Sequence, residues 1–411
     1  MATIGADMSG PSGAARPERG SALPGRALTL VHTGQAPTRS ALTAALGVTR
    51  TTAGAVTGEL RALRLIRVET GPGDGSHGRP SHRLLIDPEG PVAIAAQVHP
   101  DGFEVALVGL GGRIVAAESS QAEIPGDPGR ALAPLAEAAG RLLRQAGRRC
   151  AGAALAVASA VSQPEGATVA ALYLGWPDGA KVRDIFAELL AEQGITMPDG
   201  LNCVAANDIN AVALAEHRHG AGQGASNLLV VASGHRGVGG ALVLGGALYS
   251  GSTGLGMEAG HVSVDPNGRP CPCGNRGCLS VETDAQRFLE EAGRIPAPGS
   301  AVLDQAIAVL RGEYGTDPKV RAAAAVFIGH LGLGLAGLVN VLNPDRILLG
   351  GLHGELLRAA PDSLRTTVAE RTPWGRGAAV PILSCTLGHG GLIGAAELAW
   401  QPVLDDPAIL A

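Results

Sequence analysis

Aromatic residues are scarce in this chain of 411 residues, at 2% of the composition. Such scarcity argues against a broad base-stacking surface for single-stranded nucleic acid. Charged residues are also few, at 17%, whereas hydrophobic residues reach 45%. The chain can therefore bury sizeable cores, and disorder cannot dominate it. Its length is sufficient for two or three domains.

The sequence shows no mark of export. Its first residues contain no basic start followed by an apolar run, so no signal peptide is evident. One apolar segment, residues 322–342, is long enough to span a bilayer. It contains His330, Asn340 and several glycines and has no flanking aromatic belt, so we interpret it as a buried helix of a large domain. Three of the six cysteines fall in one cluster, and we expect a reducing, cytoplasmic location without membrane association.

Positive charge is concentrated near one end of the sequence. Residues 25–86 contain eight arginines against three acidic residues, a formal charge of +5. The whole chain carries −5, so the remaining residues sum to −10. A small basic head on a larger acidic body is typical of a nucleic-acid-binding module fused to another domain.

The pattern of the head predicts a winged helix-turn-helix domain over residues 23–87, after a mobile, Gly-, Ala-, Ser- and Pro-rich tail over residues 1–22. A short helix near residues 27–31 is followed by a second, with Thr38 as its N-cap and Gly47 at its end, and by a third from Thr49 to Leu63. Two short strands, near residues 65–68 and 83–86, flank a glycine-rich wing.

The head offers six candidate DNA contacts. The start of the third helix would enter the major groove, where arginine reads guanine and threonine bonds phosphate or touches a thymine methyl group. An arginine on the wing suits a narrow minor groove. The alternative is a helical bundle that binds protein and whose arginines are merely solvated. The candidates are Arg39, Thr49, Arg50, Thr51, Thr52 and Arg79.

A cluster of thiols predicts a metal site. Cys271, Cys273 and Cys278 fall within eight residues, and His261 lies ten positions before the first. Three thiolates and one imidazole form a closed tetrahedral set for Zn²⁺ with no open position, so the metal is expected to be structural. The alternative is a disulfide or ordinary free thiols, but Cys-Pro-Cys is too tight to bridge easily and nothing else indicates export.

The same stretch carries a family resemblance. Glu258-x-Gly-His261, followed by Cys271-x-Cys-Gly-Asn-Arg-Gly-Cys278, resembles the signature of the ROK family (repressors, open reading frames and sugar kinases), and the likeness extends essentially over residues 23–400. It implies an α/β body of two actin-like (ribonuclease H-like) lobes, to which the repressors add an N-terminal winged helix-turn-helix. The first lobe would cover residues 91–206, the second lobe with the zinc site 207–390, and a C-terminal helix, 391–411, would return to the first lobe.

The resemblance also implies a sugar site in the cleft between the lobes, formed by Asn207, Asp208, Glu258 and His261. In the kinases the aspartate of the Asn-Asp pair removes a proton from a sugar hydroxyl, as a positioned carboxylate can. Two further positions depart from the family pattern: Tyr173 stands where the family has Asn, and Ser280 where it has a sugar-binding Glu. The effector is therefore expected to be a sugar derivative, such as an amino or phosphorylated sugar, or there is none.

The phosphate loops argue against catalysis. The first should read Asp-x-Gly-Gly-Thr in the family, but residues 97–102 read Gln-Val-His-Pro-Asp-Gly. The acidic metal partner, the paired glycines and the threonine are missing, and Pro100 removes an N–H donor. The second loop survives in altered form over residues 234–240. No catalytic residue is therefore expected.

These observations predict a cytoplasmic transcriptional regulator, a repressor of carbohydrate genes. It would bind an inverted repeat of double-stranded DNA as a homodimer or a dimer of dimers and respond to a sugar or amino-sugar effector. One alternative is an active ATP-dependent sugar kinase with an added DNA-binding head. Another is a zinc-stapled scaffold for protein interactions.

Overall fold

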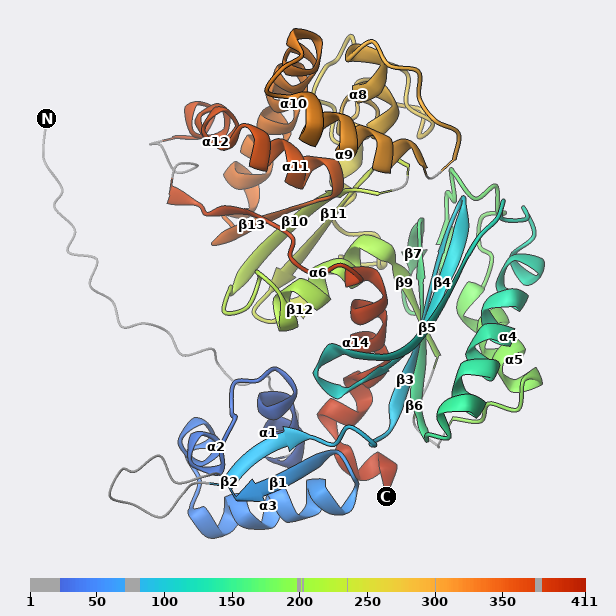
Figure 1. Cartoon of the computed structure of the whole chain (residues 1–411), viewed down its shortest axis with the longest axis vertical. Coiled ribbons are helices and arrows are strands. Elements are labelled where there is room, and N and C mark those ends of the chain that lie inside the picture. Colours follow the sequence, from blue (N-terminus) through green and yellow to red (C-terminus); the bar gives the residue numbers. More distant parts are fainter. Residues whose placement is uncertain are drawn as a thin grey trace, which may run out of the picture.

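The structure, a computed structural model, describes residues 23–70, 82–197, 201, 203–234, 236–299, 301–373 and 379–411. Three regions are visible in Figure 1: a small N-terminal head, a first lobe built on one sheet, and a second lobe built on another. The expected tail (1–22), the wing tip with Arg79, and His235 of the second glycine-rich loop lie outside the described residues.

The head is a helix-turn-helix followed by a two-stranded wing, which confirms the predicted fold of this region. Thr38 and Thr49 are N-caps, accepting the N–H groups of Ala41 and Thr52 at 3.1 Å each. Leu28, Leu60 and Ile66 are buried in its core. Its elements are α1 (Leu23–His32), α2 (Arg39–Leu46), α3 (Arg50–Ala62), β1 (Ile66–Thr70) and β2 (His82–Ile86), the two strands being antiparallel.

The first lobe is a five-stranded sheet in the order β5-β4-β3-β6-β9. Helices α4 and α5 cover one face with an apolar layer that includes Leu132, Leu155 and Phe186. A small hairpin follows β6. The elements are β3 (Val92–His99), β4 (Gly102–Gly109), η1 (Leu110–Gly112), β5 (Arg113–Gln121), α4 (Pro128–Ala146), β6 (Cys150–Val157), β7 (Ala160–Ser162), β8 (Ala167–Val169), α5 (Val182–Glu192) and β9 (Cys203–Asn207).

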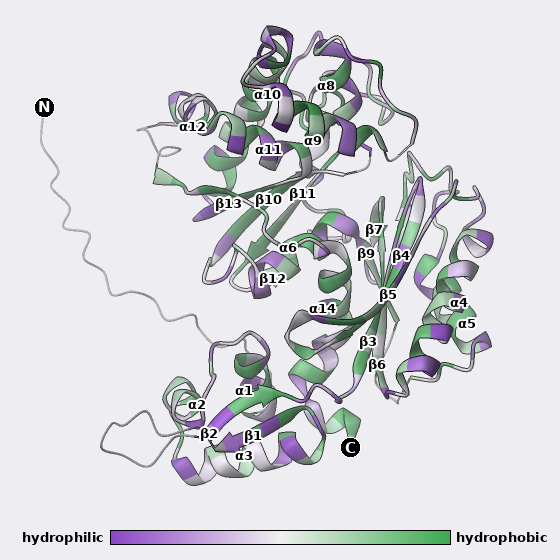
Figure 2. Cartoon of the chain, viewed as in Figure 1, coloured by the Kyte–Doolittle hydropathy of each residue, from purple (hydrophilic) through white to green (hydrophobic). Residues whose placement is uncertain are grey.

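The second lobe is another five-stranded sheet, in the order β12-β11-β10-β13-β14. Its strands β10, β11 and β13 are predominantly hydrophobic, as Figure 2 shows, because helices bury them. The elements are β10 (Asn227–Ser233), β11 (Val238–Leu244), β12 (Ala247–Leu248), η2 (Ala259–His261), α7 (Leu279–Glu282), α8 (Ala285–Glu291), α9 (Ala301–Glu313), α10 (Pro318–Leu342), β13 (Arg346–Gly350), α11 (Gly351–Ala359), α12 (Pro361–Glu370) and β14 (Ile382–Ser384).

Helix α10 contains the apolar segment noted in the sequence. By length and composition it could cross a membrane, and 56% of its most apolar window is buried inside the structure. Leu331, Leu335 and Val339 belong to the core of the second lobe. This placement fits the core helix of a large domain.

Two helices link the regions. Helix α6 (Asp208–His219) follows β9, and α14 (Gly390–Asp405) packs against α6, β3 and β6 before the chain ends in η4 (Pro407–Leu410). The two helices meet backbone to backbone: a Cβ atom at Gly394 would lie 1.7 Å from the carbonyl oxygen of Ala211. Only glycine permits this approach, so the two helices form one tightly packed pair.

Candidate functional site

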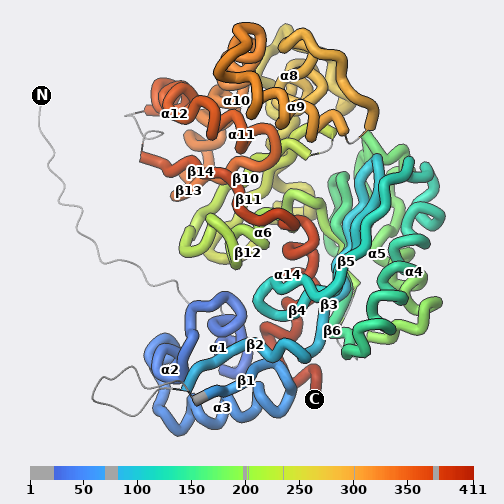
Figure 3. The backbone as a smooth tube through the Cα atoms, in the orientation of Figure 1, coloured from blue at the N-terminus to red at the C-terminus, as the bar shows by residue number. Residues whose placement is uncertain are grey.

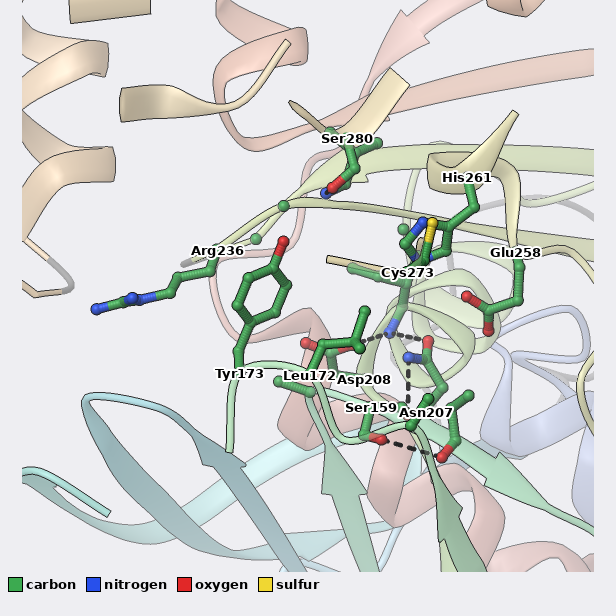
Figure 4. Close-up of a pocket in the computed structure, with 18 of the residues that line it drawn as sticks. Ser159, Leu172, Tyr173, Asn207, Asp208, Arg236, Glu258, His261, Cys273 and Ser280 are labelled. Carbon is green, nitrogen blue, oxygen red and sulfur yellow. Dashed lines mark hydrogen bonds between the residues drawn. The ribbon is translucent and has the colours of Figure 1, made fainter. Parts of the chain in front are cut away.

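A cavity of about 260 Å³ lies between the two lobes. The four candidate sugar contacts come from two distant parts of the sequence, and the structure brings all of them to this cavity (Figure 4). Apolar side chains such as Leu172 and Leu255 form part of its wall, and further polar residues complete it. A small cavity with a few convergent polar groups is the usual form of a small-molecule site. The convergent residues are Asn207, Asp208, Glu258 and His261.

Asn207 and Asp208 are fixed by the start of helix α6. The Asn207 side chain caps the helix, its Oδ1 accepting the N–H groups of Ile209 and Asn210 at 2.9 and 3.2 Å. Its Nδ2 donates to the Ser159 carbonyl oxygen at 3.1 Å, which ties α6 to the loop after β6. The Asp208 carboxylate accepts the Ile209 N–H at 2.9 Å. Both side chains are thus held in place before any ligand arrives.

The environment of the cavity raises the pKa of both of its carboxyl groups. Desolvation raises the pKa of Asp208 to about 7, with a smaller contribution from the negative charge of Glu258. Desolvation also raises the pKa of Glu258, although nearby His261 opposes the shift. Near neutral pH, Asp208 can therefore either accept or donate a hydrogen bond, which suits the hydroxyl groups of a polyol.

The predicted metal ligands form one compact cluster. The ligand atoms of His261, Cys271, Cys273 and Cys278 all lie within 4.8 Å of one another. The Cys271 Sγ to His261 Nδ1 and Cys273 Sγ to Cys278 Sγ distances are both 3.7 Å. Tetrahedral Zn²⁺ with bonds of about 2.3 Å requires sulfur atoms about 3.8 Å apart. The donor set could therefore hold a metal ion, and its chemistry fits zinc.

Local backbone pairing gathers this cluster. The Leu279 N–H donates to the Val262 carbonyl oxygen at 2.9 Å, and the Cys271 N–H to that of Asn275 at 2.8 Å. Gly277 allows the fold, because a Cβ atom there would lie 1.6 Å from the Asp265 carbonyl oxygen. His261 and Cys273 belong to the cluster and also line the cavity. A bound metal would therefore stiffen one wall of the candidate sugar site.

The two positions that depart from the family pattern face each other across the cleft. The hydroxyl group of Tyr173, from the first lobe, points toward Ser280 of the second (Figure 4). Ser280 is buried, and its Oγ accepts the Val238 N–H at 3.0 Å. Burial raises the pKa of Tyr173, so the phenol remains a neutral donor.

The turn that replaces the first phosphate loop is occupied by internal contacts. Backbone oxygens of Pro100 and Asp101 accept the N–H groups of Ile124 and Ala122 at 3.3 and 3.1 Å. The Asp101 carboxylate lies 3.8 Å from the Arg236 guanidinium of the second lobe. In Figure 4, Arg236 points away from the other labelled side chains. Arg236 falls within the second glycine-rich loop, residues 234–240, but nothing in the sequence indicated its contact with Asp101, and Ser159 belongs to no motif.

The candidate DNA contacts of the head differ in their availability. Thr49, Arg50 and Thr51 are exposed at the start of α3. The hydroxyl groups of Thr49 and Thr52 lie 2.9 Å apart and hydrogen bond to each other, so both are engaged in capping the helix. Arg50 and Thr51 therefore remain as the better candidates for base contacts. Arg39 is partly buried at the start of α2.

The sequence of this chain is similar to those of known proteins. A sequence model of the ROK family matches residues 100–401. The DNA-binding transcriptional dual regulator NagC of Escherichia coli (strain K12) is 26% identical over 215 residues, which are 50% of this chain and 52% of that protein. This chain thus spans about half the length of that curated relative. A glucokinase of Streptomyces coelicolor is 28% identical over 218 residues, 49% of this chain and 68% of that enzyme.

Solved structures agree on the fold. A ROK family transcriptional regulator, homologous to the E. coli MLC protein, matches with a TM-score of 0.73 at 21% identity and covers 94% of this chain and 96% of that chain. A ROK family glucokinase from Streptomyces griseus, in complex with glucose and AMPPNP, matches with a TM-score of 0.62 at 24% identity, over 75% of this chain and 99% of that chain. With a family match over most of its length, the chain belongs to the ROK family.

Proposed function

We propose that this protein is a DNA-binding transcriptional regulator that represses carbohydrate genes and whose body binds a sugar or sugar derivative. The observation that carries the proposal is the joining of a winged helix-turn-helix head to a two-lobed body that retains a polar cavity. Two likenesses support this assignment: one to NagC, over half of the chain, and one to a solved ROK transcriptional regulator, over 94% of it. A cytoplasmic location follows from the role.

The DNA-binding surface in this proposal is the start of α3, with Arg50 and Thr51 as the principal readers. A homodimer, or a dimer of dimers, would bind an inverted repeat, because a two-fold protein matches two-fold DNA. The wing residue Arg79 and the α2 residue Arg39 would bind near the backbone or the minor groove. The six candidate contacts together would give affinity that falls with salt.

The body, in this proposal, senses its ligand and does not phosphorylate it. Phosphoryl transfer depends on positioning and on stabilising charge at the transferred group. The turn at residues 97–102 lacks the acidic metal partner, and Pro100 offers no N–H donor to a phosphate. Asp208 retains the geometry of a base, and the chain resembles glucokinases as well, so an active kinase is the competing function to be tested.

In this proposal, the zinc ion is structural. His261, Cys271, Cys273 and Cys278 would hold the ion with no open position, and the ion would supply folding energy to the wall of the cavity. His261 would then link the metal to the ligand, because it belongs to both sites.

The test combines DNA selection with ligand release. Selection from a random DNA pool yields the operator, and a thermal-shift screen of glucose, N-acetylglucosamine and their 6-phosphates identifies the ligand. We expect the ligand to release the protein from DNA. Asp208→Ala should abolish this release and leave DNA binding without ligand intact, whereas Asp304→Ala, on the exposed side of α9, should behave like the parent. Failure to select any DNA would refute the proposal, as would an Asp208→Ala variant with the parent's response.

A further inference from the structure

Far from the cleft, five polar side chains from three elements meet in one buried cluster, which we call the Glu397 joint. Glu397 lies on α14 and is completely buried. Its carboxylate oxygens lie 2.8 Å from His32 Nε2 on α1, 2.7 Å from an Arg218 nitrogen and 2.9 Å from His219 Nε2, both on α6. Arg218 also donates to Gln401. The members are His32, Arg218, His219, Glu397 and Gln401.

The protonation of His32 follows from geometry. The backbone N–H of Gly111, in η1 of the first lobe, donates to His32 Nδ1 at 2.9 Å. Nδ1 is therefore the acceptor, and Nε2 carries the proton that it donates to Glu397. Burial lowers the pKa of His32 despite the opposing pull of Glu397, so the imidazole is neutral. Arg218 supplies the positive charge that balances the carboxylate.

Two histidines and a carboxylate could also form a metal site, but the hydrogen bonds of the joint exclude this alternative. The ligand atoms of His32, His219 and Glu397 lie within 4.8 Å of one another. A metal bound at His32 Nε2 would place the proton on Nδ1, where it would face the Gly111 N–H. The cation would also compete with Arg218 for the same carboxylate. The joint is balanced in charge without an ion.

The joint sits where the head meets the body. The apolar core of the head is continuous with the layer between α14 and the first-lobe sheet, from Leu28 to Trp400. In Figure 3 the C-terminal helix lies beside the head, and a Cβ atom at Gly25 of α1 would lie 2.4 Å from the Asp405 carbonyl oxygen. Apolar contacts are non-directional, so the directional contacts of His32, with Glu397 on α14 and with the Gly111 N–H of the first lobe, favour one orientation of α1.

Helix α6 connects this joint to the cavity. It begins at Asp208, in the cavity, and ends at His219, in the joint. Twelve residues of α-helix span about 18 Å. The helix is tied to the segment before α14, because the Glu216 carboxylate accepts the N–H groups of Thr386 and Leu387 at 2.6 and 2.8 Å. The helix therefore offers a continuous, rigid connection between the Asp208 end and the joint.

We propose that the Glu397 joint couples the cleft to the DNA-binding head: it fixes the orientation of α1, and α6 moves it when the lobes close on a ligand. This inference rests in part on the proposed function. Because α6 and α14 pack as one pair, closure that moves α6 carries Glu397 along with Arg218 and His219, and Glu397 then loses the His32 donor unless α1 follows. A buried charge that loses a donor is strongly disfavoured, so the head must reorient with the helices. His32 and His219 are positioning residues in this device.

The first experiment needs neither DNA nor effector. Hydrogen exchange is measured by mass spectrometry on the full-length, zinc-loaded protein and on His32→Leu. Loss of one hydrogen bond to a charged group should accelerate exchange in residues 23–33 and 108–113 by about tenfold or more. His32→Gln, which keeps a donor near the Nε2 position, should remain close to the parent. The control is His353→Leu, which removes an equally buried histidine bound to Thr283 in the second lobe and should leave both peptides unchanged.

The second experiment measures coupling. The affinity for the selected operator is determined with and without each of four probes, namely glucose, N-acetylglucosamine and their 6-phosphates. We expect a probe to weaken DNA binding by the parent and to leave the affinity of His32→Leu unchanged, while the thermal shift caused by that probe persists. If no probe affects the parent, the proposed sugar response fails, and with it the coupling role. The exchange experiment then still decides whether the joint fixes the orientation of α1. Unchanged exchange in His32→Leu overturns the proposal. So does a second zinc ion per chain that this variant loses.

Discussion

Replacing Asp208 by asparagine tests the electrostatics of the cavity without removing the side chain. The pKa of Asp208 rises from an ordinary 3.8 to about 7, chiefly because the surrounding protein desolvates the carboxylate. Each pKa unit corresponds to about 1.36 kcal/mol, so ionising this group in the folded protein costs up to about 4 kcal/mol. Asparagine has the same shape and no proton to lose.

The sign of the effect follows from proton counting. Between about pH 4 and pH 7, the folded protein binds more protons at this site than the unfolded chain does, so stability falls as pH rises. The contribution of Asp208 is therefore present below about pH 4 and is lost as pH increases through 7. Relative to the parent, Asp208→Asn should gain unfolding free energy between pH 5 and pH 8, by an amount that approaches the upper limit of about 4 kcal/mol.

Urea unfolding followed by circular dichroism at pH 5, 6, 7 and 8 measures this gain as a difference between two proteins at each pH, so effects of pH on the zinc cluster cancel. Asp304→Asn, at an exposed position on α9, is the matched control and should show no such trend. Parallel curves for Asp208→Asn and the parent would refute the reasoning, and so would an equal gain in the control.

Three further predictions concern the other sites. Cys273→Ser should lose the single zinc ion per chain and unfold at a lower temperature, whereas Cys385→Ser should retain the metal. Elemental analysis that finds no zinc in the parent would contradict the predicted metal site. Arg50→Ala should cost roughly 1–3 kcal/mol of operator binding and relax the base preference at one position, measured by fluorescence anisotropy at fixed salt. Arg79→Ala should weaken binding with less change in sequence preference. Full affinity in Arg50→Ala would exclude α3 as the helix that reads the bases. With ATP and any of the four sugar probes, the protein should form no ADP at an enzymatic rate, in contrast to a sugar kinase.

Local features of the sequence were sufficient for the head and for the metal cluster. Thr38 and Thr49 predict helix starts because a threonine oxygen can accept a free N–H group of the first turn, and both do so in the structure. The four candidate zinc ligands lie within eighteen consecutive positions, so short turns alone can gather them. The sugar cavity is different: Asn207 and Glu258 are distant in sequence, and only the family resemblance predicted that they would converge.

The Glu397 joint could not be predicted at all. His32 and Glu397 are 365 positions apart, and each occurs in a helix whose pattern gives no sign of a polar partner. A lone histidine at the end of an amphipathic helix is most simply read as solvated. The contact exists because the last long helix returns between the head and the first lobe, and that path depends on packing over the whole chain.

The departures from the family pattern take on a different meaning once their contacts are known. In the sequence, Tyr173 and Ser280 read as two separate losses of sugar contacts, but in the structure the Tyr173 hydroxyl group points toward Ser280 from the opposite lobe. Likewise Asp101, in the altered first loop, lies near Arg236 of the second. Side chains of the protein itself thus join the lobes in a region where a kinase would handle substrate.

In the proposed sensor, contacts of this kind would favour the arrangement in which the two lobes approach each other. They also set a limit on the response. A ligand can shift the lobes only through a difference in its affinity for the two arrangements. Moving a population from 1:99 to 99:1 would take about 5.5 kcal/mol of such difference. In the proposed device, a contact between the lobes that favours closure without a ligand, such as that of Asp101 with Arg236, would lower the difference in affinity that the ligand has to supply before α6 moves the head.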